Sequence, residues 1–217
     1  MLRKIFICAM IFTAILICGC GEDKVLGTPD KAILAFAETV LTGESPNLAA
    51  SGLSEDDQKA IRYAMTNRFI DTMKSIAPLS NESAEQLTKI YFDKLKGNVK
   101  ISATLKKDDS DRPIVAVTTT PIDQSAVAKS AGKNDDFLAL IGMVGKLKSD
   151  GATDDQLKEN PEVQKLAVTA IEKYINSLSF QPEKTFDVPC VKVKGNDGNN
   201  HWAPVEGDAL INFLTGQ

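Results

Sequence analysis

The sequence predicts an α+β protein in which helices cover one face of an antiparallel sheet of about four strands. Three amphipathic helical segments open the folded part of the chain, and two alternating segments that suit a β-hairpin follow them. A second hairpin comes near the C-terminus, after a helical insertion. Helices and hairpins kept in separate blocks along the chain are typical of α+β folds rather than of parallel α/β folds.

Three helices are expected before the first strand. The first starts at Thr28–Asp30, where a threonine N-cap precedes a proline and an acid, and its apolar residues recur with helical spacing over 33–41 until Gly43 ends it. The second is expected over 54–78, from an acidic N-terminal turn to a proline, and the third over 80–97. All three helices should pack an apolar stripe against a core.

Alternating apolar residues predict four strands in two hairpins. The first hairpin joins residues 99–106 to 112–120 through a charged turn. The second joins 185–194 to 201–205 through a turn rich in glycine and asparagine. The apolar phase slips at Pro189–Cys190, so we expect a β-bulge there.

The two hairpins are separated by a predicted two-helix insertion. Its helices are expected over 124–147 and 153–178, and a short helix over 208–214 closes the chain. Gly142 and Gly145 within the first of these helices suit either close helix packing or simple weakening of the helix. Five residues on apolar stripes or hairpins are expected to be largely buried: Phe36, Ile101, Val117, Ile171 and Trp202.

The first twenty residues have the plan of a secretory signal peptide. Arg3 and Lys4 precede an almost unbroken apolar run over 5–18, which is shorter than the ~20 residues of a membrane-spanning helix. We therefore expect residues 1–19 to be removed as a signal. Cys8 and Cys18 would leave with it.

The end of this run, Leu16–Cys20, resembles the lipobox of bacterial lipoproteins. Ile17 and Gly19 stand where that motif has a branched apolar residue and a small one. The resemblance implies a lipidated Cys20. We expect a tether over 20–27 and a single α+β domain over 28–217 after it. Two or more acyl chains hold a protein stably on a membrane. The expected location is the extracytoplasmic face of the cell membrane, or the outer membrane in a bacterium with two.

Composition and motifs argue against several kinds of chemistry. A formal charge of −4 does not suit nucleic-acid binding, and a single histidine leaves no His-rich metal site. Ser130–Lys133 matches an S-x-x-K pattern without its partner motifs. His201 is expected to be exposed beside a turn, and Cys190 to be a buried, inert thiol. We expect no catalytic residue, cofactor or metal, and hence no enzyme.

Short motifs along the mature chain resemble a family of bacterial lipoproteins of unknown function, the DUF5105 group, and the related DUF4878 group. They lie at 28–32, 120–123, 200–205 and 208–210. The resemblance implies the NTF2-like, or cystatin-like, fold. The family has no established catalytic residues, so it assigns none here.

Together these observations predict a non-enzymatic module of the cell envelope that binds a small ligand or an envelope protein. Its lipid on Cys20 would be its contact with the membrane. One alternative is an NTF2-like enzyme, which would need acid–base residues converging in a pocket. Another is an immunity or inhibitor lipoprotein, which would show an exposed apolar patch instead.

Overall fold

The computed structural model describes residues 25–131, 133–195 and 198–216, and there it has an α+β fold with a five-stranded sheet. The expected class, a sheet with helices packed on it, is confirmed. The strand order is β1-β5-β4-β3-β2. The strands are β1 (Val25–Leu26), β2 (Ile101–Lys107), β3 (Ile114–Thr119), β4 (Lys184–Lys194) and β5 (Asn200–Pro204).

The sheet differs from the expected four-stranded antiparallel one because β1 joins it. The two hairpins, β2–β3 and β4–β5, are antiparallel, and β3 pairs antiparallel with β4. β1 instead runs parallel to β5, with Val25 opposite Asn200, so the sheet is mixed. Residues 25 and 26 were expected in the tether. A two-residue segment has no periodicity to reveal it, and only the unpaired edge of β5 recruits it into the sheet.

The expected bulge at Pro189–Cys190 is wrong. β4 pairs with β3 up to Pro189, opposite Ile114, and with β5 from Cys190 onward, opposite Pro204, with no register shift in either ladder. Pro189 lies where the pairing of β4 changes from β3 to β5, and such a position tolerates the missing N–H group of a proline. A register shift lies instead in β2, between Leu105 and Lys107.

The helices begin and end at clear sequence signals. They are α1 (Pro29–Thr42), α2 (Leu48–Ser51), α3 (Glu55–Ile76), α4 (Asn81–Lys96), α5 (Gln124–Ala131), α6 (Asp135–Ser149), α7 (Asp154–Glu159), α8 (Pro161–Asn176) and α9 (Gly207–Thr215). The expected two-helix insertion is therefore four helices. Asn134, Thr153 and Asn160 each accept a hydrogen bond from the following backbone and start a new helix.

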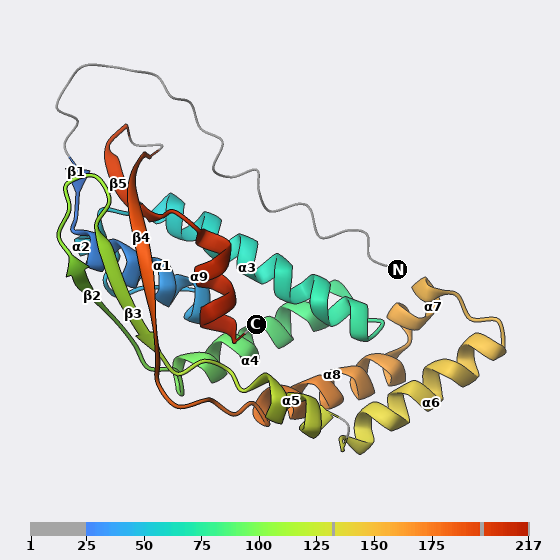
Figure 1. The fold of residues 1–217 in the computed structure, drawn as a ribbon. Coiled ribbons are helices and arrows are strands. Elements are labelled where there is room, and N and C mark those ends of the chain that lie inside the picture. Colours follow the sequence, from blue (N-terminus) through green and yellow to red (C-terminus); the bar gives the residue numbers. More distant parts are fainter. Residues whose placement is uncertain (1–24, 132, 196–197, 217) are drawn as a thin grey trace.

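Helices pack in successive layers away from the sheet. α1 contacts β2, β3 and β5, and the sheet curls around it (Figure 1). α9 contacts β4 and β5, α3 and α4 pack on α1, α8 packs on α4, and α6 packs on α8. α6 and α7 thus lie at the end of the molecule opposite β1 (Figure 1). None of the helices in the described part of the chain combines the length and hydrophobicity that a membrane crossing needs.

α1 forms the centre of the core, since seven of its residues are buried, including Ile33 and Leu41. Of the five residues expected to be buried, Val117, Ile171 and Trp202 are, with Trp202 only 8% exposed. Phe36 and Ile101 are less completely buried, and both pack against the margin of the core. Ile101 begins β2, an edge strand with a neighbour on one side only.

Candidate binding site

A cavity of about 600 Å³ lies where the helical layers meet the β2 edge of the sheet. Elements far apart in the sequence form its walls: the end of α1, the loop after it, the first turn of α3, the end of α4 and the start of β2. The lining residues are Glu38, Leu41, Thr42, Glu44, Ser45, Pro46, Gln58, Lys96, Val99 and Ile101. It combines an apolar floor with four charged or amide side chains.

The loop after α1 is folded back by a carboxylate. α1 ends at Gly43, whose φ of 78° is in the left-handed region, and its N–H group donates to the Thr39 carbonyl. Ser45 Oγ then donates to Glu38 Oε2 at 2.5 Å. Asn47 Nδ2 donates to both Glu38 oxygens, at 2.9 and 3.0 Å. Glu38 therefore holds the loop as a hydrogen-bond acceptor in the cavity wall.

An ion pair lies at the solvent-exposed rim of the cavity. Lys96, in the last turn of α4, pairs with Glu44. The hydrogen bond from Lys96 lowers the pKa of Glu44, and the same bond raises the pKa of Lys96. Both groups are charged at neutral pH. This pair therefore does not suit proton transfer.

Gln58 also lines this cavity. Its Nε2 atom is buried and has no hydrogen-bond partner among the described residues. A capping box between Ser54 and Asp57 fixes the start of α3 one residue before it. The lining of the cavity thus combines apolar side chains with the held Glu38 carboxylate and the Glu44–Lys96 pair, a mixture that suits a small polar ligand.

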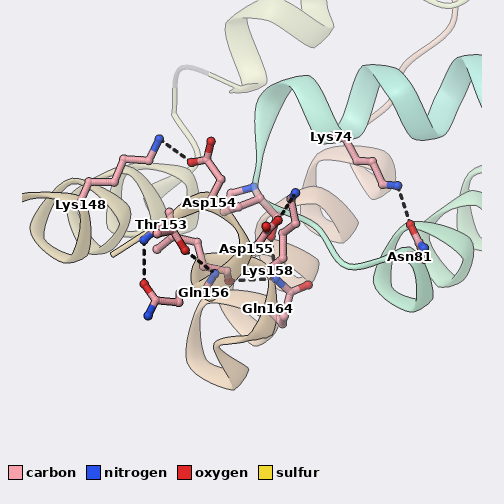
Figure 2. Close-up of polar contacts among 11 residues, drawn as sticks. Lys74, Asn81, Lys148, Thr153, Asp154, Asp155, Gln156, Lys158 and Gln164 are labelled. Carbon is pink, nitrogen blue, oxygen red and sulfur yellow. Dashed lines mark hydrogen bonds and ion pairs between the residues drawn. The ribbon is translucent and has the colours of Figure 1, made fainter. Parts of the chain in front are cut away.

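A second hollow, of about 470 Å³, lies between the α3–α4 connection and α7. Its two lysines are each engaged: Lys74 Nζ donates to Asn81 Oδ1 at 2.7 Å, and Lys158 pairs with Asp155 at 3.0 Å (Figure 2). Gln164 joins the walls by accepting from the Ser80 N–H group and donating to the Pro78 carbonyl. The two hydrogen bonds of Gln164 join α8 to the segment that leads into α4.

Residues singled out in the sequence do not converge on either hollow. His201 is buried at 2% exposure, so its expected exposure is wrong: β5 is flanked by both β1 and β4 and faces α1. Trp202 anchors the hairpin, with Lys192 Nζ 5.4 Å from the centre of its ring. Cys190 is fully buried, which confirms that part of the expectation, and burial raises the pKa of its thiol to about 12.

Several aspartates at turns and helix starts have local structural roles. Asp57 accepts from the N–H group of Ser54 in a capping box, and Asp154 pairs with Lys148 (Figure 2). Backbone N–H groups in the following turn hold the pKa of Asp109 at about 2. Across residues 25–131, 133–195 and 198–216, no three His, Cys, Asp or Glu side chains lie close enough to hold a metal ion. Cys20, and the Ser130 side chain of the S-x-x-K match, lie outside the described residues.

Two features of the structure could not be predicted from the sequence. The cavity draws its walls from residues 38–101, and no local spacing reveals which of these meet in space. The other feature is the outward face of α6, where Leu138 is 61% and Ile141 66% exposed. Their spacing suits a buried stripe, but α8 covers only the opposite face, on which Leu140 is buried.

Comparisons with known proteins bear on the fold. No family model matches the chain, and no curated protein matches it. Among solved structures, that of ycdA from Bacillus subtilis subsp. subtilis str. 168, described as a candidate lipoprotein, is similar, with a TM-score of 0.58 and 20% sequence identity. The likeness covers 88% of this chain and 56% of that one, so this chain spans little more than half the length of its structural neighbour. At this identity the comparison shows a shared fold.

Proposed function

We propose that this protein is a lipoprotein, anchored by lipid on Cys20 at the extracytoplasmic face of a membrane, that binds a partner rather than catalysing a reaction. The observation that carries the anchor is the lipobox-like Leu16–Cys20 at the end of a short apolar run. The candidate lipoprotein ycdA, which shares the fold, supports it. So do the motifs that resemble DUF5105 lipoproteins and their NTF2-like fold.

The anchor would hold one end of the domain close to the bilayer. β1 begins at Val25, five residues after Cys20. Five residues span at most about 18 Å when extended. The β1 end would therefore sit near the lipid surface, and α6 and α7, at the opposite end, would face away from it (Figure 1).

A binding role accounts for the cavity better than catalysis does. Glu38 is occupied by three hydrogen bonds from its own loop, and Glu44 and Lys96 neutralise each other. An acid–base site needs groups whose environments push their pKa values towards the operating pH. The pKa of Glu44 is lowered and the pKa of Lys96 is raised, so both pKa values move away from neutral pH.

Replacement of Cys20 tests the anchor. The Cys20→Ser variant should accumulate as an unprocessed precursor, incorporate no labelled fatty acid and show altered fractionation. Cys18→Ser is the matched control, because Cys18 is a neighbouring cysteine that leaves with the signal. It should be processed and labelled normally. A mature, membrane-retained Cys20→Ser protein would contradict the proposal.

Turnover assays test the non-catalytic role. The protein would be incubated with panels of hydrolase and isomerase substrates, alongside Glu38→Gln and Lys96→Met variants whose folding has been checked. We expect no turnover by any of them. A turnover that disappears in these variants would establish the cavity as an active site.

A further inference from the structure

The outward face of α6 has no partner within the described residues. Leu138 and Ile141 are more than 60% exposed, and the positions where Gly142 and Gly145 would carry a Cβ have no atom within 4 Å. With helical spacing, these four residues form one strip along the side of α6 that points away from α8. We call them the α6 strip.

The composition of the α6 strip does not serve the stability of a single copy. Glycine in an exposed helix interior destabilises the helix relative to alanine, because it gains no packing and loses more backbone entropy. Exposed leucine and isoleucine leave apolar surface in water. Two large apolar residues beside two glycines instead form protrusions next to hollows, which is the shape that close helix pairing uses.

We propose that the α6 strip is a homodimer interface, in which α6 packs antiparallel on α6 of a second copy across a two-fold axis beside Ile141 and Gly142. In this register Leu138 faces the partner's Gly145, and Gly145 faces the partner's Leu138. Gly142 meets the partner's Gly142, which allows the backbones to approach closely. A two-fold interface requires one patch that is complementary to itself, and the strip meets that condition.

The charges at the ends of α6 match the same register. Asp135 begins the helix and Lys146 lies about three turns later, so both are on the same flank of the strip. Antiparallel pairing would place Asp135 within about 3 Å, along the helix axis, of the partner's Lys146, given a rise of 1.5 Å per residue. Neither side chain forms an ion pair with the described residues of its own chain.

A second copy fits this strip better than a lipid surface does. Helices that lie on membranes have a broad apolar face flanked by many basic residues. The α6 strip has two large apolar residues and opposite charges at its two ends. One helix pair buries less surface than the ~800 Å² per partner of a stable interface, so the dimer should be weak in solution. Confinement of anchored copies to one membrane raises their effective concentration and favours it.

Disulfide cross-linking tests the interface on the full chain. The Gly142→Cys variant, treated with a mild oxidant in the cell fraction that contains it, should give several-fold more dimer on a non-reducing gel than Ala60→Cys. Ala60 is an exposed position on α3, and both variants keep every native cysteine. Fractionation is scored separately, so a failed anchor is distinguishable from a failed interface. Equal cross-linking of the two variants would overturn the proposal.

Second-site changes in the Gly142→Cys background test the register. Leu138→Lys should abolish most of the cross-link, and Asp135→Lys should reduce it. Adding Lys146→Asp to Asp135→Lys should restore the cross-link. Lys146→Asp alone should reduce it, as Asp135→Lys does. Thermal melting of each variant verifies the fold. A cross-link that is insensitive to Leu138→Lys, or one made to a different protein, would overturn the assignment.

Discussion

Removal of the Glu38 carboxylate should destabilise the protein through the loop that it holds. In Glu38→Ala, Ser45 Oγ and Asn47 Nδ2 lose the acceptor that lies 2.5 to 3.0 Å from them, and Ser45 is only 9% exposed. Hydrogen bonds to a charged group contribute about 1.5–3 kcal/mol each. Because water can enter the open cavity and partly replace them, we expect a loss of about 3 kcal/mol in the free energy of unfolding. This corresponds to about 6–12 °C in Tm for a chain of this length.

Urea unfolding followed by the fluorescence of Trp202, the only tryptophan, measures this loss. The urea dependence of the unfolding free energy should stay constant while the midpoint falls. Glu44→Gln is the matched control in the same loop, since Glu44 pairs with Lys96 at the solvent-exposed rim. It should change stability far less. A loss in Glu38→Ala no larger than that in Glu44→Gln would refute the role assigned to Glu38.

Four further variants probe the core, the N-terminal strand, α6 and the buried thiol. Trp202→Ala should cost about 3–5 kcal/mol, measured by thermal unfolding in circular dichroism. Gly27 has a φ of +72°, and in Gly27→Ala the new Cβ would lie 2.1 Å from a backbone oxygen of α2, so hydrogen exchange at β1 should accelerate. Gly145 has open space around it, so Gly145→Ala should stabilise α6 by about 0.5–1 kcal/mol. Burial raises the pKa of Cys190 from 9.0 to about 12, so the unfolded chain loses the thiol proton first and stability falls as pH rises through this range. Cys190→Ala should reduce that fall between pH 8 and 10, and an unchanged pH dependence would contradict the assignment.

The placement of the two surfaces has a functional consequence. The cavity lies at the β2 edge of the sheet, and two helices, α4 and α8, lie in succession between α1 and α6. A ligand in the cavity and a second copy on α6 would therefore bind without competing for the same residues. Their variants, Glu38→Ala and Leu138→Lys, separate the two roles experimentally.

The sequence alone determines the elements whose signals are local. The N-caps and helical spacing of α1, α3 and α4 and the alternation of β2 and β3 predict those elements correctly, because caps, prolines and periodicity act over a few residues. The buried state of Val117, Ile171 and Trp202 follows from the same patterns. The single histidine and the lipobox-like segment can also be read without a structure.

Tertiary structure decides everything that depends on which element lies beside which. β1 is too short for any pattern and forms only because β5 offers it an edge. His201 is buried because strands flank β5 on both sides, although its neighbours along the chain form a polar turn. Leu138 and Ile141 have the spacing of core residues and yet face solvent, because α8 covers the other side of α6. Local patterns specify a helix and its apolar residues, but contacts between segments distant in sequence determine which of its faces is buried.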